Sequence, residues 1–457
     1  MASSDRLVGR LAYFTNAGPL VDYGPRAGIV AAVVGVHGSG RNARAMLRRL
    51  VAAVAKNNDD GGLLSSTTSA GDGIDDDDDC HERTKTKTTT ANGVCEILVI
   101  APWFLAPVDI CPPPECSPPY LRWVDDAHGP LGIEHSFRYG PESIAVPFDD
   151  GDAINAAETN TISSYAAMDV LVETLCDRAN YPDLERILVV GHSAGGQLVH
   201  RWGLTSGSWC FGDDGGDTCP LPSIRIVAAN PRSYTYLDGR RYLPAASAAD
   251  DAFSPRDDYG GGRGPLVSSL FDDLEFRLPT ESELKECRHY NLYMWGLEEN
   301  ADLPAPYVTR NVERLMTLDS GKCGENINNA DTLFCRYAAR NVIYLSGERD
   351  TEKLEDQISK GDGYQGPTRR DRCERFYASL QVRGNEILRY RHREKMTDDD
   401  DEKGRINNSR NLAKERFHSK HTEGQEMRVH RHIIVKSVGH NGALMFQSKE
   451  GLMAMFG

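Results

Sequence analysis

The stretch Arg186-Ile-Leu-Val-Val-Gly-His-Ser-Ala-Gly195 decides the fold of this chain. Residues 187–190 are an unbroken apolar run, which is typical of a strand buried on both faces. The next five residues fit the pattern G-x-S-x-G, and a helical stretch, Gln197–Gly203, follows at once. Such a strand–turn–helix forces the Ser193 backbone into a sharp, strained turn and holds its hydroxyl clear of the sheet at a helix N-terminus. Because neighbouring backbones crowd the turn, it requires small residues, here Gly191, Ala194 and Gly195.

On both sides of this turn, short apolar runs alternate with amphipathic stretches. Strands are expected at Ile29–Val36, Cys95–Ala101, Arg186–Val190, Ile224–Ala229, Asn341–Ser346 and His432–Ser437. Helices are expected at Asn42–Lys56, Ser163–Arg178, Gln197–Gly203, Thr368–Leu380 and Leu444–Met455. This alternation predicts an α/β fold with a mainly parallel, doubly wound sheet and helices on both faces.

Four inserts interrupt what we interpret as one domain over residues 1–457. Residues 57–92 are rich in Gly, Ser, Thr and Asp, and residues 391–426 are charged, so both are expected to be disordered. Residues 103–152 are rich in proline and aromatic residues and are expected to form an ordered loop. Residues 232–340 are expected to form a cap or lid, whose aromatic side chains either wall a pocket or pack within the cap.

The serine turn requires a base, because a serine hydroxyl is a poor nucleophile until its proton is removed. His440 is the best placed of thirteen histidines, since it follows the last predicted strand at the edge of the sheet where doubly wound folds place their sites. A loop histidine with a structural hydrogen bond is the alternative. Asp350 follows the predicted strand Asn341–Ser346 and is expected to orient the base. Glu348 and Glu352 are neighbouring carboxylates that could take the same role.

A glycine-rich loop, His37-Gly-Ser-Gly-Arg-Asn42, follows the strand Ile29–Val36. We expect the backbone N–H groups of Ser39 and Ala194 to form an oxyanion hole, which holds the charge that develops on a substrate carbonyl. Residues expected to support the turn and the loop are His37, Gly38, Gly40, Gly191, His192 and Gly195. Because the loop fits neither G-x-G-x-x-G nor G-x-x-x-x-G-K-[ST], it does not indicate phosphate binding.

The overall charge of −15 argues against nucleic acid and anionic membrane surfaces as partners. Much of that charge comes from two short runs, Asp75–Asp79 and Asp398–Glu402. No apolar stretch near the start has the length of a signal peptide, and Ile29–Val36 is too short to span a bilayer, so we expect a cytoplasmic protein by default. No spacing among the eleven cysteines is typical of zinc, so we expect no metal.

With these pieces in place, the chain resembles α/β-hydrolases, and more narrowly a little-characterised group of bacterial and fungal members. It is more distantly similar to polyhydroxybutyrate depolymerases and feruloyl-esterase-like enzymes. The resemblance covers most of the predicted core through His37–Asn42, Gly191–Gln197, Ala229–Asp238, Tyr290–Leu297, Gly347–Thr351, Gln365–Arg369 and Gly439–Asn441. The chain order Ser, Asp, His also matches α/β-hydrolases. The resemblance implies the fold, the triad and hydrolysis of an acyl bond, but no particular substrate.

We therefore expect a serine hydrolase that cleaves a carboxylic ester of a small molecule through an acyl-enzyme, without a cofactor. An amidase, peptidase or acyltransferase could use the same residues, because one fold hosts many chemistries. Two other hypotheses are a non-catalytic binding module on a hydrolase scaffold and an interaction protein that works through its acidic inserts. The complete set of Ser193, Asp350 and His440 argues against the binding module.

Overall fold

The computed structural model describes twelve stretches of the chain. They are residues 10–20, 24–59, 87–90, 93–110, 120–125, 136–144, 161–211, 221–244, 274–317, 329–353, 360–405 and 430–457.

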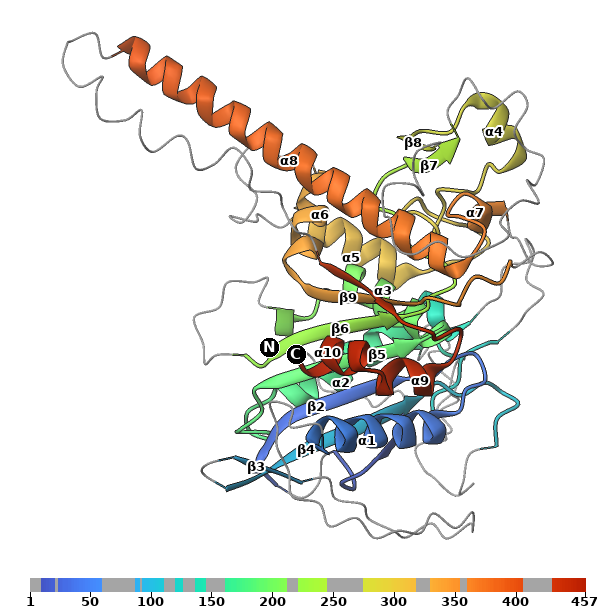
Figure 1. The fold of residues 1–457 in the computed structure, drawn as a ribbon, viewed down its shortest axis with the longest axis vertical. Helices are drawn as coiled ribbons and strands as arrows, with labels where there is room; N and C mark the ends of the chain where they lie inside the picture. The colour runs from blue at the N-terminus through green and yellow to red at the C-terminus, as the bar shows by residue number, and fades with distance from the viewer. Residues whose placement is uncertain are drawn as a thin grey trace, which may run out of the picture.

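An eight-stranded sheet lies at the centre of the molecule (Figure 1). Six neighbouring strands run parallel, in the order β4 (Gly93–Trp103), β2 (Ile29–Val36), β5 (Arg186–His192), β6 (Ser223–Ala229), β9 (Asn341–Gly347) and β10 (Arg431–Val435). Two short strands, β1 (Ala12–Thr15) and β3 (Lys87–Thr90), pair antiparallel with β4 at one edge. The mainly parallel sheet predicted from the sequence is confirmed. Its parallel order brings the carboxyl ends of the six strands to one edge, where such folds place their sites.

Hydrophobic cores lie on both faces of the sheet, because the central strands carry apolar side chains on both sides. In β2, Val34 belongs to one core and its neighbour Val33 to the other. The first core is covered by α2 (Ser164–Cys176), α3 (Ala194–Thr205), α5 (Pro306–Thr317), α6 (Asn329–Ala339) and the first part of α8 (Arg369–Arg405). The second is covered by α1 (Ala43–Asp59), α9 (Gly442–Gln447) and α10 (Lys449–Phe456). The predicted doubly wound arrangement is therefore present.

Two of the predicted helices differ from the structure by more than a few end residues. The stretch Leu444–Met455 forms two helices instead of one, because the Ser448 hydroxyl accepts the N–H of Gly451 and caps the second. The helix predicted at Thr368–Leu380 continues to Arg405. The assignment of residues 391–405 to a disordered insert was wrong: they contain no proline, and their Arg, Lys, Glu and Met residues favour a helix. Residues 406–426 of that insert lie outside the described residues.

The predicted disordered insert 57–92 is ordered at both ends. Asn57 and Asn58 are buried in the last turn of α1, so that packing extends the helix through residues that locally favour a loop. Residues 87–90 form β3, which pairs with β4. Residues 60–86 and 91–92 lie outside the described residues.

The predicted loop insert 103–152 is described over 103–110, 120–125 and 136–144. Backbone hydrogen bonds tie these pieces together, since the N–H of Trp123 donates to Leu105 and the N–H of Ile144 donates to Arg122. The last piece includes the short 3-10 turn η1 (Phe137–Tyr139), which packs beside α3.

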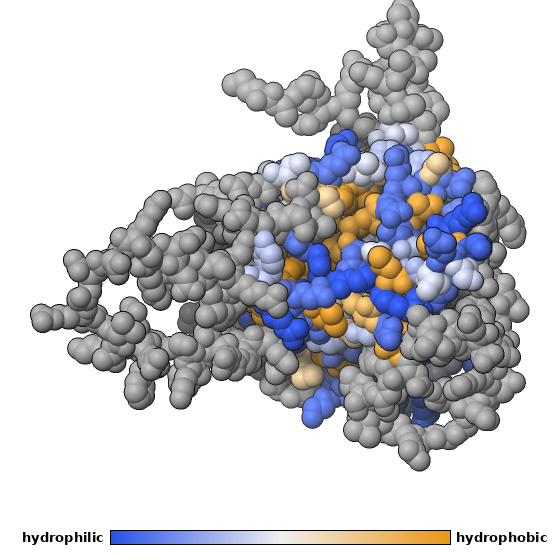
Figure 2. Space-filling model, turned by 90° about the horizontal axis from the view of Figure 1, so that it is seen from above, coloured by the Kyte–Doolittle hydropathy of each residue, from blue (hydrophilic) through white to orange (hydrophobic). Residues whose placement is uncertain are grey.

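The predicted cap, residues 232–340, contributes mainly to the core where it is described. Four of its aromatic side chains are buried in the first core: Tyr234, Tyr236, Trp295 and Tyr307. Its smaller elements are β7 (Arg241–Pro244), β8 (Leu274–Arg277) and α4 (Glu281–Glu286), which lie with α7 (Lys360–Gly363) at the upper right of Figure 1. Figure 2 shows the molecule from above, where hydrophobic residues near the middle of the surface alternate with hydrophilic ones.

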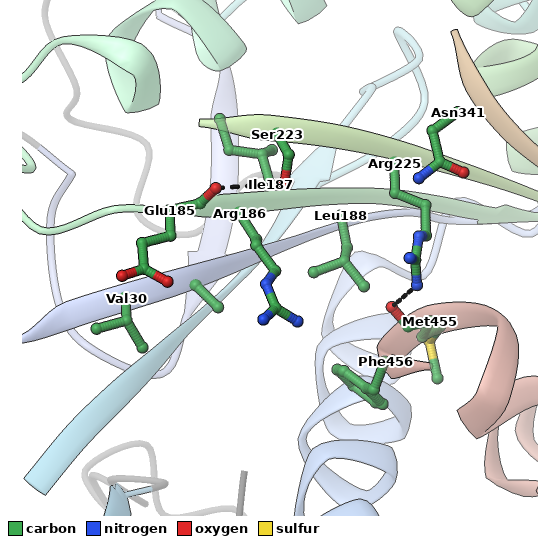
Figure 3. A pocket seen from close by; sticks show the side chains of 11 residues that line it. Val30, Glu185, Arg186, Ile187, Leu188, Ser223, Arg225, Asn341, Met455 and Phe456 are labelled. Carbon is green, nitrogen blue, oxygen red and sulfur yellow. Dashed lines mark hydrogen bonds between the residues drawn. The ribbon is translucent and has the colours of Figure 1, made fainter. Parts of the chain in front are cut away.

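A pocket lies at the amino ends of the strands, opposite the edge described above (Figure 3). It is lined by the starts of β2, β5, β6 and β9 together with Met455 and Phe456 of α10. The Arg225 guanidinium donates there to the carbonyls of Ala454, Met455 and Gly457, a favourable place for a cation at a helix C-terminus. None of the predicted site residues lines this pocket. Through these hydrogen bonds, Arg225 anchors the last helix to the sheet.

Two negative findings concern the described stretches alone. No helix there is both long enough and apolar enough to cross a membrane. In the same residues, His, Cys, Asp and Glu side chains form no group of three or more that could hold a metal ion.

Candidate active site

Ser193 lies between β5 and α3 in a backbone conformation that few residues other than glycine adopt, with φ 59° and ψ −115°. Its N–H donates to the carbonyl of Ala229 on β6 at 2.9 Å, and its carbonyl accepts the N–H of Gln197 at 3.0 Å. The strained turn expected of G-x-S-x-G is thus present, and it places Ser193 at the N-terminus of α3, where the helix dipole favours negative charge.

Three glycines make this turn possible, because a methyl group on any of them would overlap a backbone carbonyl. A Cβ added to Gly191 would lie 2.2 Å from the carbonyl oxygen of Gly195. One added to Gly195 would lie 2.1 Å from that of Val36, and one added to Gly196 would lie 2.6 Å from that of Ala229. The first two were predicted from the turn pattern. The sequence did not single out Gly196, because it lies just outside the five-residue pattern and its crowding comes from β6.

Two hydrogen bonds join Ser193, His440 and Asp350. His440 Nδ1 lies 2.8 Å from Asp350 Oδ2, and His440 Nε2 lies 3.0 Å from Ser193 Oγ. Because an ionised carboxylate can only accept, we place the proton on Nδ1, which leaves Nε2 to accept the serine hydroxyl proton. The Asp350 side chain is 2% exposed and that of His440 is 30% exposed, so the carboxylate is shielded while the imidazole remains accessible.

Neither of the other two candidate carboxylates, Glu348 and Glu352, pairs with His440. Glu348 Oε2 accepts the N–H of Ser437 at 2.8 Å, which directs this side chain to the end of β10. Glu352 is exposed. The carboxylate beside His440 is therefore that of Asp350.

The loop of residues 37–42 lies against Ser193, since an added Cβ on Gly38 would be 3.8 Å from Ser193 Cβ. The buried His37 ring uses both nitrogens, as Nδ1–H donates to the Gly38 carbonyl at 2.9 Å and Nε2 accepts the N–H of Phe104 at 3.1 Å. Burial lowers the pKa of His37 to about 4. Its neutral ring has no free lone pair to act as a base and holds the loop in place.

The predicted oxyanion donors lie on the two segments that meet at Ser193: Ser39 on this loop and Ala194 at the start of α3. Ser39 and Gly40 are exposed. Arg41 fastens the far end of the loop, because its Nε donates to Asp109 Oδ2 at 2.8 Å and its Nη1 pairs with Asp125. These ion pairs connect the loop to the described parts of the insert 103–152.

His192, the residue before Ser193, is a buried neighbour of His440, with ring centroids 4.7 Å apart. Burial, with the charge of a protonated His440 as a second cause, lowers the pKa of His192 to about 3. The ring is therefore neutral near pH 7 and adds no positive charge beside His440.

Asn230 is a site residue that sequence reasoning did not single out. It ends β6 with φ 45°, a left-handed conformation that asparagine tolerates better than most residues. Its buried side chain accepts the N–H of Gly347 at 2.8 Å and donates to the carbonyl of Gly439 at 3.2 Å. Gly347 precedes Asp350 by three residues and Gly439 directly precedes His440. One amide thus connects the two loops that carry these side chains.

Asn230→Gly is expected to lower kcat for an activated ester by about 10- to 100-fold with little change in KM, because a small displacement of the two loops suffices to misalign reacting groups. Glycine is the informative substitution, since it accepts the positive φ without strain and removes only the amide. Steady-state kinetics would measure the effect. Asn341→Ala, at the exposed start of β9, is the matched control. Equal kinetics for both variants and the native protein would contradict this role.

No protein-family model matches the chain, and no curated protein matches it. Among solved structures, it is similar to poly(aspartic acid) hydrolase-1 from Sphingomonas sp. KT-1, with 14% identity over 93% of this chain and 87% of that one and a TM-score of 0.40. It is also similar to LpqC, a poly(3-hydroxybutyrate) depolymerase from Bordetella parapertussis, with 15% identity, 96% and 82% coverage and a TM-score of 0.40. It is similar as well to the siderophore hydrolase EstA from Aspergillus nidulans, with 9% identity over 99% of this chain and 97% of that one and a TM-score of 0.31.

The chain's own features identify its fold. These are the parallel sheet in the order β4-β2-β5-β6-β9-β10, its helices on both faces, and the strained serine turn between β5 and α3. The positions after β9 and β10 carry Asp350 and His440, the chain order typical of this fold. The chain therefore has the α/β-hydrolase fold.

Proposed function

We propose that this chain is a serine hydrolase that cleaves carboxylic esters through an acyl-enzyme intermediate. The observation that carries the proposal is the hydrogen-bonded series from Asp350 through His440 to the Ser193 hydroxyl. A serine within reach of a neutral imidazole, which is oriented by a buried carboxylate, is the arrangement that activates a hydroxyl for acyl transfer. Its position on a strained turn supports the same role, because strain of this kind is retained at functional sites.

In the proposed reaction, Ser193 Oγ attacks the ester carbonyl carbon while His440 Nε2 takes the hydroxyl proton. Asp350 stabilises the imidazolium that forms. Nε2 then returns the proton to the departing alcohol as the carbon–oxygen bond breaks, leaving an ester of Ser193. A water molecule attacks this acyl-enzyme with His440 again acting as base, and the acid leaves with regeneration of the serine hydroxyl.

Negative charge develops on the carbonyl oxygen during both attacks. We assign its stabilisation to the backbone N–H groups of Ser39 and Ala194. One such donor contributes on the order of 10²- to 10³-fold to the rate. The α3 N-terminus adds its dipole at the same place. His37 contributes indirectly, since it fixes the Gly38 carbonyl and with it the course of the loop.

Labelling with a fluorophosphonate probe tests the proposal, because the probe reacts with activated serines. The native chain should be labelled, and Ser193→Ala and His440→Ala should not. Ser223→Ala is the matched control, since Ser223 lies at the opposite end of the sheet and is drawn in Figure 3. Unlabelled, well-folded native protein would contradict the proposal, as would labelling that survives Ser193→Ala.

Ester cleavage is separated from amide cleavage by a matched pair of substrates with one acyl group, a p-nitrophenyl ester and a p-nitroanilide. We expect kcat/KM to be higher for the ester by several orders of magnitude, because its leaving group departs without needing full protonation. Comparable values for the two substrates would instead favour an amidase or peptidase. A product formed with an added alcohol in place of water would favour an acyltransferase.

A further inference from the structure

The second oxygen of the Asp350 carboxylate has a partner that the mechanism above does not use. Oδ2 accepts from His440, while Oδ1 lies 3.4 Å from Nη1 of Arg369. Both side chains of this ion pair are well shielded, with 2% of Asp350 and 14% of Arg369 exposed. The carboxylate is thus shared between an imidazole and a permanently charged guanidinium.

The N-terminus of α8 is built to hold Arg369 in this place. Thr368 caps the helix: its hydroxyl accepts the N–H of Asp371 at 3.1 Å, and the Asp371 carboxylate accepts the N–H of Thr368 at 3.2 Å. The N–H of Arg370 reaches the Asp350 carbonyl at 3.4 Å. The first turn of α8 is therefore fixed against the turn that carries Asp350, and Arg369 is its first residue.

A guanidinium at this position has two opposing effects. It holds Oδ1 of Asp350 and so orients the carboxylate with Oδ2 facing His440. It also repels a proton on His440, since the two positive charges would share one carboxylate across a few ångströms of poorly solvated protein. Without the guanidinium this repulsion is absent, and the acidic limb of the pH–activity profile is expected at a higher pH.

The other charged and titratable groups around His440 do not duplicate this contact. His192 on β5 is neutral over the working range. Arg49 on α1 lies near the His192 side of the site, and α9 carries no charged residue. Glu348 faces Ser437 and Lys436. Among the described residues, the ion pairs of Asp350 are those with His440 and Arg369.

We propose that Arg369 is a positioning residue that orients Asp350 through its second oxygen and, by its charge, extends activity to lower pH. The inference rests on the proposed function of the same site. It assigns Arg369 no contact with the substrate, so its predicted signature is a change in pH dependence rather than in KM.

The test is the pH profile of kcat/KM with a p-nitrophenyl ester at low ionic strength. In Arg369→Gln, the midpoint of the acidic limb should move up by about half to one pH unit, since one nearby cation has been removed. Arg369→Lys keeps the charge and should keep the native midpoint, although its plateau should fall because a lysine does not reproduce the planar guanidinium. Arg369→Met, which keeps the unbranched stem, is a second neutral variant in case glutamine impairs folding.

Arg370→Gln is the matched control. It removes the same charge one residue later, where the side chain contacts Glu374 and the Glu348 carbonyl instead of Asp350. Its acidic midpoint should stay at the native value. A folded neutral Arg369 variant with the native midpoint, or an equal shift in Arg370→Gln, would overturn the inference. Fluorophosphonate labelling of the native chain keeps the two questions apart: if it succeeds while the midpoints are equal, only the role of Arg369 fails.

Discussion

Alanine in place of His440 is expected to lower kcat for an activated ester by about 10³- to 10⁶-fold, because loss of the base returns Ser193 to the reactivity of an ordinary alcohol. The residual rate would come from the oxyanion donors and from substrate binding. Measured kcat and the rate of fluorophosphonate labelling should fall together. Because the His440 side chain is 30% exposed, added imidazole has a route to the vacated position and should restore part of the activity.

The matched control is His289→Ala, which removes a histidine between α4 and α5 that is not part of the hydrogen-bonded set of Ser193, His440 and Asp350. It should retain native kinetics. A His440→Ala variant with more than about a tenth of native activity would mean that another group serves as the base, because general bases typically contribute 10²-fold or more.

Gly195→Ala is expected to cost about 3 kcal/mol of folding free energy and to abolish turnover in any molecules that fold. The added methyl would lie 2.1 Å from the carbonyl oxygen of Val36 and 2.6 Å from that of His37, and neither backbone atom can move without displacing β2 or the loop after it. α3 would shift away from β2 and carry Ser193 with it. Urea unfolding at neutral pH would measure the loss as a lower midpoint with an unchanged slope.

Gly40→Ala provides the stability comparison, because an added Cβ there meets nothing within 4 Å. Its unfolding midpoint should correspond to a change within about 0.5 kcal/mol of the native protein. If Gly195→Ala were as stable as Gly40→Ala, the crowding at the serine turn would not constrain the sequence in the way that the structure indicates.

The sheet could be predicted from sequence because its central strands are buried on both faces, which produces unbroken apolar runs. Ile29–Val36 was predicted with the bounds that β2 has. The edge strand β1 was missed, since its four residues, Ala12-Tyr-Phe-Thr15, are too few to form a recognisable pattern. The extent of α8 was missed because residues 391–405 are as highly charged as a disordered segment, although their helix-forming residues continue a packed helix.

Within the candidate site, local patterns predicted the residues whose position follows from one strand and one turn. Ser193, Asp350 and His440 each lie in the loop after a strand of the parallel sheet, so one topological rule brings them to one edge. Asn230 also follows a strand, and that position was the signal that could have found it. Arg369 offers no such signal, because its approach to Asp350 depends on how the first turn of α8 is capped and docked.

The wide separation of the three side chains in the chain has a consequence for folding. His440 lies 247 positions from Ser193 and 90 from Asp350, so no short segment can hold the set. Parallel strands pair only after their long crossover connections have closed, which makes such contacts late and slow. Recovery of the proposed activity after dilution from denaturant is therefore expected to lag behind recovery of helical ellipticity. Activity should return only when the last long-range contacts of the sheet have formed.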